Sequence, residues 1–149
     1  MTSYNEYLAL TDQLASSGLT GRELREEAMK ALDQLPGYDW SGIYTLHGKE
    51  LHLDAYVGAE TDHTVIPVGV GVCGSAVEDD ENKLIDDVRR ESNYLACSLA
   101  TRSEIVVLIR RDSQVLGQID IDSHTEAWFT TEDEKGLTAL AELLAENWD

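Results

Sequence analysis

The residues best suited to chemistry are two cysteines and three acids in the central part of the chain. Cys73 and Cys97 are the only thiols in the sequence, and Glu104, Asp120 and Asp122 follow them. A thiolate is a nucleophile that can be oxidised to a sulfenic acid, and a second thiol can convert that sulfenic acid to a disulfide. A carboxylic acid kept protonated by neighbouring acids can supply the proton for such a step. These residue types favour thiol redox chemistry assisted by acids.

The spacing of the three acids predicts that they lie together. Segments 103–110 and 115–122 are rich in Ile, Val and Leu and are predicted to form a hairpin. In that hairpin Glu104 lies beside the end of the second strand, where Asp120 and Asp122 share one face because they are two residues apart. Charges this close raise each other's pKa unless a cation, a proton or bound donors offset them. We therefore interpret this strand end as a ligand contact.

Each of these residues also has a simpler explanation. Free cysteine is most often a buried small hydrophobe, which would suit Cys97 between Ala96 and Ser98. For Cys73, at a predicted helix start, core packing and redox chemistry are equally compatible with the sequence, although a helix N-terminus would lower the pKa of its thiol. The acids would then be solvated surface groups of a salt-adapted protein.

Hydrophobic periodicity predicts the elements that position these residues. The expected helices cover 4–17, 24–35, 75–80 and 131–144, and the further expected strands cover 40–46, 51–57 and 84–85. Thr20 to Glu23 and Thr131 to Glu134 have the spacing of capping boxes at two helix starts.

An aromatic pair lies on the first predicted strand. Trp40 and Tyr44 share a face with Gly42 between them, because all three are separated by two residues. Such a pair is usually core. Here Gly42 predicts open space between the rings, as a wall of a ligand site would need.

Length and charge exclude several classes of function. The 149 residues fit one domain, 1–149, and the net charge of −18 comes from 29 acids and 11 bases. That charge repels nucleic acid and anionic membranes, and the dispersed acids are typical of proteins adapted to concentrated salt. No apolar run suits a membrane span, and the N-terminus lacks the pattern of a secretory signal. Two cysteines in such a chain indicate a reducing compartment, so we expect a cytoplasmic protein.

A further set of motifs consists of Ile66–Gly69, Gly71–Gly74, Ala96-Cys97, Ser103–Val106, Gly117 and Asp120–Ser123. This set resembles a known family, the free methionine-(R)-sulfoxide reductases built on a GAF domain. The match runs from about Trp40 to Phe129 and on through Thr131–Leu137. It implies an α+β, GAF-like fold in which a central antiparallel sheet of five to six strands has helices mainly on one face and a ligand pocket on the other.

The resemblance also implies roles for single residues. Cys97 would be the attacking cysteine, and Cys73 would be the resolving or an accessory cysteine. Glu104, Asp120 and Asp122 would hold the amino group and the sulfoxide of the substrate. The aromatic residues that would enclose the methyl thioether end are Trp40 and Tyr44.

The sequence departs from the family at His63, where a third cysteine is common. The resemblance implies a free methionine sulfoxide as substrate, an external thiol reductant such as thioredoxin and no bound cofactor. No metal is expected, because the four histidines do not cluster with the cysteines at zinc spacing. A homodimer is left open. The alternative function is a non-catalytic GAF sensor that binds a small anion or an amino-acid-like ligand and acts with a signalling partner.

Overall fold

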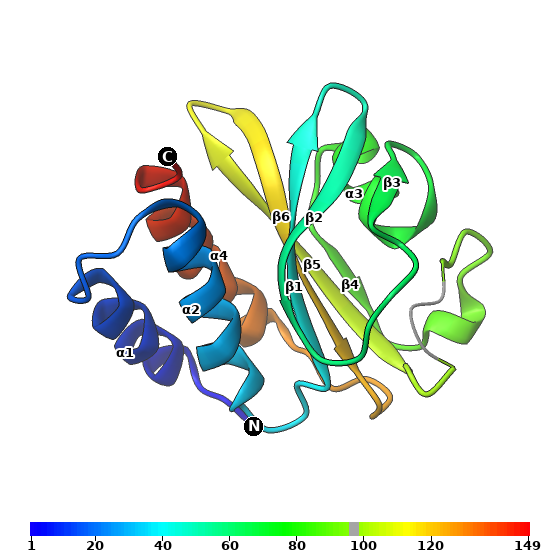
Figure 1. The fold of residues 1–149 in the computed structure, drawn as a ribbon. Helices are drawn as coiled ribbons and strands as arrows, with labels where there is room; N and C mark the ends of the chain where they lie inside the picture. The colour runs from blue at the N-terminus through cyan, green and yellow to red at the C-terminus, as the bar shows by residue number, and fades with distance from the viewer. Residues whose placement is uncertain (96–98) are drawn as a thin grey trace.

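The computed structural model of this protein describes residues 1–95 and 99–149. Figure 1 shows its elements along the chain. The helices are α1 (Tyr4–Ala15), α2 (Gly21–Asp33), α3 (Gly71–Asp79), the 3₁₀ helix η1 (Val88–Arg90) and α4 (Thr131–Glu146). The strands are β1 (Trp40–His47), β2 (Glu50–Val57), β3 (Val65–Pro67), β4 (Lys83–Ile85), β5 (Ser103–Arg111) and β6 (Gln114–Ser123). None of the described helices combines the length and the apolar character that crossing a membrane requires.

The six strands form one antiparallel sheet in the order β3-β2-β1-β6-β5-β4. The central hairpin β5–β6 turns at Asp112 and Ser113, whose positive φ angles of 52° and 69° suit a tight hairpin turn. Glu104 on β5 lies directly opposite Asp122 on β6, which confirms the predicted register. On the other side of β6, Trp40 of β1 also pairs with Asp122. The α+β class and the six-stranded sheet agree with the expected fold.

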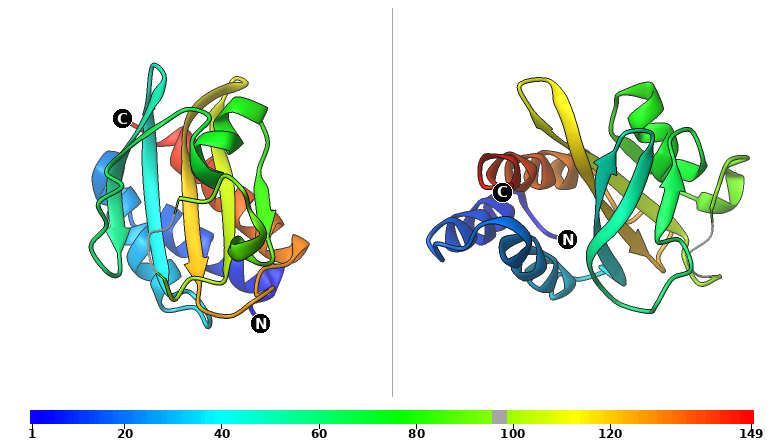
Figure 2. Two further views of the ribbon diagram at one scale, coloured as in Figure 1. Left: turned by 90° about the vertical axis from the view of Figure 1, so that its right-hand side faces the viewer. Right: turned by 45° about the horizontal axis from the view of Figure 1, so that its top comes forward.

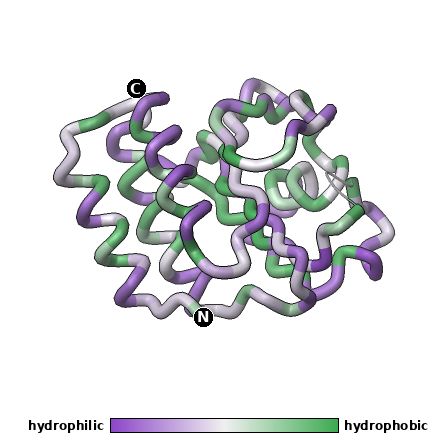
Figure 3. Tube along the Cα trace, turned by 60° about the horizontal axis from the view of Figure 1, so that its bottom comes forward, coloured by the Kyte–Doolittle hydropathy of each residue, from purple (hydrophilic) through white to green (hydrophobic). Residues whose placement is uncertain are grey.

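Three helices cover one face of the sheet, and α3 lies on the other (Figures 1 and 2). The helix-covered face carries alternate residues of the central strands, so that Ile105, Ile119 and Ile121 pack in a core with residues of α1, α2 and α4. Along these helices hydrophilic and hydrophobic stretches alternate, as Figure 3 shows. The opposite face carries the residues between them and packs against α3. The period of two therefore sends the isoleucines and the aspartates of β6 to different layers.

The helix starts differ from the prediction in three places. Thr20 makes no side-chain capping hydrogen bond, and the Gly21 N–H at the start of α2 donates to the Asn147 carbonyl from the end of α4. The capping box of α4 is formed by Thr130 and Asp133, one residue earlier than predicted. Helix α3 begins at Gly71 and so includes Cys73 in its first turn.

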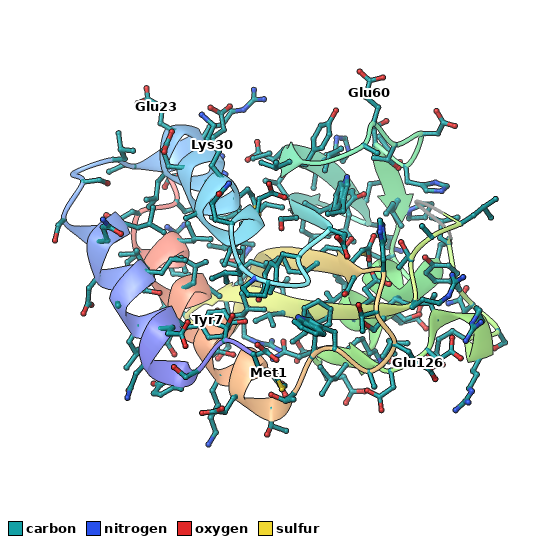
Figure 4. All side chains as sticks on the ribbon, turned by 90° about the horizontal axis from the view of Figure 1, so that it is seen from below. Met1, Tyr7, Glu23, Lys30, Glu60 and Glu126 are labelled. Atoms are coloured by element: carbon teal, nitrogen blue, oxygen red, sulfur yellow. The ribbon has the colours of Figure 1, made fainter. Side chains whose placement is uncertain are left out.

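A buried hydrogen-bonded network joins the helices to the start of the sheet. The Tyr7 hydroxyl donates to Asp133 Oδ1 at 2.5 Å, so the hydroxyl of Tyr38 must donate to Tyr7, because a phenol carries one proton. Figure 4 labels Tyr7 on α1 and shows Glu23 and Glu60 at the molecular surface. The network fixes α1 on α4 and so closes the helix layer behind the sheet.

Candidate active site

The three acids predicted to gather at one strand end do lie together, and they are buried. Glu104, Asp120 and Asp122 are on the face of the sheet that meets α3, with exposed fractions of 4%, 1% and 2%. The interpretation of these acids as solvated surface groups is therefore wrong. Their gathering follows from the hairpin register and from the period of two along β6.

Cys73 approaches the acids from the opposite side. It is the third residue of α3, it is 6% exposed, and its Sγ lies 3.9 Å from Glu104 Oε2. One ligand atom from each of Cys73, Glu104 and Asp120 lies within 4.8 Å of the others. The packing of α3 onto β5 and β6 thus brings Cys73 into contact with an acid about 30 residues away in the sequence.

Burial controls the protonation of this site. Burial, followed by the charges of Asp120 and Glu104, holds the pKa of the Cys73 thiol well above its usual value. The expectation that a helix N-terminus lowers this pKa is wrong, because desolvation and two neighbouring carboxylates oppose the thiolate more strongly than the helix end favours it. Cys73 is therefore a protonated thiol at neutral pH until its surroundings change.

Burial also raises the pKa values of the two aspartates of the cluster. Burial raises the pKa of Asp120, and burial together with the charge of Asp120 raises the pKa of Asp122 well above its usual value. Among residues 1–95 and 99–149 no donor lies in regular hydrogen-bond geometry to either oxygen of Asp120 or to Oδ1 of Asp122, and their remaining polar neighbours are the acidic and thiol groups of Glu104 and Cys73. No ion pair within these ranges involves either aspartate. Such a cluster is stable when protons are shared within it or when a cation enters it.

This chemistry suits an ammonium group or a metal cation. An ammonium offers three N–H donors to acceptors that lack partners. The positions of Cys73, Glu104 and Asp120 would also allow all three to contact one thiophilic divalent cation, although no metal was expected from the sequence.

The predicted aromatic residues lie beside the acids. Trp40 and Tyr44 of β1 are buried in one cluster with Cys73, on the same face of the sheet. The Tyr44 hydroxyl donates to the His63 carbonyl at 2.8 Å. This contact brings His63 to the edge of the same cluster.

The prediction of open space over Gly42 is wrong. A Cβ at this position would lie 2.3 Å from the indole of Trp40, so the ring itself covers the glycine. The Trp40 Nε1–H donates to the Ala59 carbonyl at 3.0 Å, and the ring stacks on Tyr56 with centroids 5.8 Å apart. Gly42 therefore accommodates a fixed tryptophan and leaves no gap for a ligand.

Cys97, the predicted nucleophile, lies outside the described residues. The described chain before it is attached to α3 through Asn93, whose Oδ1 accepts from the Gly71 N–H at 3.2 Å and whose Nδ2 donates to Ser75 Oγ at 2.9 Å. Tyr94 and Leu95 pack against the Cys73 cluster. The segment that leads to Cys97 therefore runs along the first turn of α3.

Sequence reasoning missed two residues of this site, Asn93 and Gln118. Gln118 precedes Asp120 by two, so the alternation along β6 places it on the same face, and that signal was available. Its Nε2 donates to the Cys73 carbonyl at 3.0 Å. Nothing in the local sequence around Asn93 indicates its contact with α3, because the partners are about 20 residues away.

The fold and this buried face define the class of protein. A six-stranded antiparallel sheet with α1, α2 and α4 on one face and α3 on the other is a GAF arrangement, and residues 21–147 match the GAF domain family.

Comparison with known proteins narrows the class. The chain is 39% identical over 108 residues to the free methionine-R-sulfoxide reductase of Escherichia coli, a match that covers 72% of this chain and 65% of that protein. It is 38% identical, with a TM-score of 0.81, to the type II free methionine-R-sulfoxide reductase of Thermoplasma acidophilum, covering 92% of this chain and 93% of the other. The Neisseria meningitidis free methionine-R-sulfoxide reductase, solved with its substrate, is 30% identical with a TM-score of 0.91, covering 97% of this chain and 89% of the other. The chain belongs to the GAF domain family and, within it, to the family of free methionine-R-sulfoxide reductases.

Proposed function

We propose that this protein reduces free L-methionine-(R)-sulfoxide to methionine, with Cys97 as the nucleophile. The observation that carries the proposal is the buried cluster of Glu104, Asp120 and Asp122 beside the Cys73 thiol, in a chain 30–39% identical to reductases of this substrate. Buried acids are retained where they bind charge or move protons, because burial without such a role costs stability.

The carboxylates supply binding and proton transfer. The ammonium of a free amino acid offsets an ionised carboxylate of the cluster and gives hydrogen bonds to the buried oxygens of Asp120 and Asp122. A peptide-bound methionine sulfoxide has no such ammonium, so the site favours the free amino acid. The methyl thioether end lies against Trp40 and Tyr44, whose positions are fixed by their own hydrogen bonds.

The reaction transfers oxygen from the sulfoxide to a cysteine. The Cys97 thiolate attacks the sulfoxide sulfur and forms an S–S bond, while a protonated carboxylic acid of the cluster gives a proton to the oxygen. The oxygen then moves to the Cys97 sulfur, so that an S–O bond forms there while the S–O bond of the substrate and the new S–S bond break. The products are methionine and a Cys97 sulfenic acid, so the substrate gains two electrons and the cysteine loses two. An acid with a raised pKa is suited to this step because it still carries its proton at neutral pH.

Recycling uses the second thiol. Cys73 attacks the Cys97 sulfenic acid, an S–S bond forms, and the oxygen leaves as water. A dithiol reductant of the thioredoxin class then reduces the disulfide, so the cycle needs no bound cofactor. Such a reductant implies a reducing compartment, for which we propose the cytoplasm.

The direct test is an assay of methionine formation with dithiothreitol as the reductant. Turnover of the free (R) epimer, with the free (S) epimer and a peptide-bound sulfoxide left unreduced, is the expected result. Binding of the free sulfoxide without methionine formation would contradict the reductase and favour a GAF sensor.

A further inference from the structure

Gln118 is a buried polar residue that the proposed reaction does not yet use. It lies on β6, two residues before Asp120 and opposite Tyr44 and Leu108 on the neighbouring strands. The side chain is fully buried, and its Nε2 donates to the carbonyl oxygen of Cys73 at 3.0 Å. This hydrogen bond joins the centre of the sheet to the first turn of α3.

Stability alone does not explain a glutamine at this position. The other amide atom, Oε1, is buried and has no hydrogen-bond partner in the described part of the chain. Leaving a buried acceptor unpaired costs more free energy than one ordinary hydrogen bond returns. A methionine of similar length would fill the same space without an unpaired polar atom. The hydrogen bond between Gln118 and Cys73 therefore indicates a role of Gln118 other than stabilising the fold.

A second amide holds the same helix turn from the other side. The residue that precedes α3 is Val70, which has no polar side chain to cap the helix. Asn93 provides the cap from a distant segment, since its Oδ1 accepts from the Gly71 N–H at 3.2 Å. The turn that carries Cys73 is thus fixed at two points, and the thiol itself contacts Glu104 Oε2 at 3.9 Å.

We propose that Gln118 is a positioning residue for Cys73 in the recycling step. The inference rests on the proposed function for its biological meaning. A disulfide requires the two Cβ atoms to come within about 3.5–4.5 Å with a restricted dihedral angle, so the orientation of the attacking thiol limits the rate. In that step the Cys73 sulfur forms the S–S bond, the S–O bond of the Cys97 sulfenic acid breaks, and the oxygen leaves as water with the thiol proton. Gln118 fixes the backbone that aims Cys73 and touches neither the substrate nor the reacting sulfur atoms.

The test is Gln118→Met, with Leu108→Met as the matched control. Leu108 is the cross-strand neighbour of Gln118 on the same buried face, so its replacement changes packing and leaves the hydrogen bond to Cys73 in place. In Gln118→Met we expect a melting temperature equal to or above that of the wild type. We also expect disulfide formation slowed about tenfold, because a misplaced reacting group lowers the rate steeply. The Leu108→Met variant should form the disulfide at the wild-type rate.

Two ways of making the sulfenic acid separate this inference from the proposed function. In one, reduced protein is mixed with methionine-(R)-sulfoxide. In the other, hydrogen peroxide oxidises Cys97 directly, and the same disulfide step follows without any reductase reaction. Mass spectrometry with a sulfenic acid trap measures the lifetime of the intermediate in both. A slow disulfide step after oxidation by hydrogen peroxide supports the inference even if the sulfoxide gives no methionine.

Three results would overturn the inference. The first is disulfide formation at the wild-type rate in Gln118→Met. The second is a lowered melting temperature accompanied by equal slowing of methionine formation and disulfide formation, which would indicate a purely structural role. The third is equal slowing in Leu108→Met, which would assign the effect to packing. If Gln118→Met does not fold, Gln118→Leu is measured in the same way.

Discussion

Replacing Asp122 with asparagine should stabilise the protein at alkaline pH while it lowers turnover. Asp122 is 2% exposed, and burial together with the charge of Asp120 raises its pKa well above the usual value of 3.8. At pH 8 the wild type must either ionise this buried group or keep a proton that the unfolded chain would release. Asparagine has the same shape and carries no charge, so it removes this penalty.

The sign and the size of the effect follow from proton linkage. A carboxyl with a raised folded-state pKa contributes stability that is fully present below about pH 3.8 and is lost as the pH rises through the folded-state pKa. Each unit of raised pKa corresponds to about 1.4 kcal/mol. For a chain of this size that is a change in melting temperature of roughly 3–6 °C. The stabilisation of Asp122→Asn relative to wild type should therefore grow from pH 4 to pH 8.

The assay is thermal unfolding of both proteins between pH 4 and pH 8 at one fixed high salt concentration. The matched control is Asp112→Asn, at an exposed position in the β5–β6 turn, and it should show no growing difference. A cost from the new amide in the buried site would act at every pH, so the change with pH isolates the charge. Turnover should fall by about 10²-fold in Asp122→Asn. A difference in melting temperature that is the same at pH 4 and pH 8 would refute the reasoning.

Other expected outcomes follow from the same site and from the charge of the chain. Glu104→Gln and Asp120→Asn should each reduce turnover by about 10²-fold. Full activity in both variants would show that these two acids take no part in the reaction. Stability and activity should rise from dilute buffer to molar potassium chloride, because salt screens the repulsion among 29 acids. A melting temperature that does not change with salt would argue against salt adaptation. Without reductant, one equivalent of sulfoxide should give methionine and a protein lighter by about two hydrogens, whereas Cys97→Ser should give none. Cys73→Ser should still give methionine and should gain the mass of one oxygen, and a wild type that only gains oxygen would make Cys73 structural.

Much of the site was predictable because strand geometry is regular. The alternation along β6 places Asp120 and Asp122 on one face, and the hairpin places Glu104 opposite Asp122. Both follow from a period of two and a short turn, which are local properties of the chain. The same regularity put Trp40 and Tyr44 on the face of the acids.

Contacts between distant segments were not predictable in the same way. The indole of Trp40 lies over Gly42, where the sequence indicated open space, because the loop that follows β2 supplies the Ala59 carbonyl for its N–H. At the start of α2 the expected local capping hydrogen bond is absent, and the Gly21 N–H donates to the Asn147 carbonyl at the end of α4. Both contacts join segments that no local pattern relates.

The sequence by itself determined which residues share a face, because side-chain direction depends on backbone period and turn length. Only the tertiary structure decided how those residues ionise. The pKa of Cys73 reflects burial and two carboxylates from strands that lie about 30 and 50 residues further along the chain, and these outweigh the helix end to which it belongs. Desolvation depends on everything packed around a group, so no local pattern in the sequence contains it.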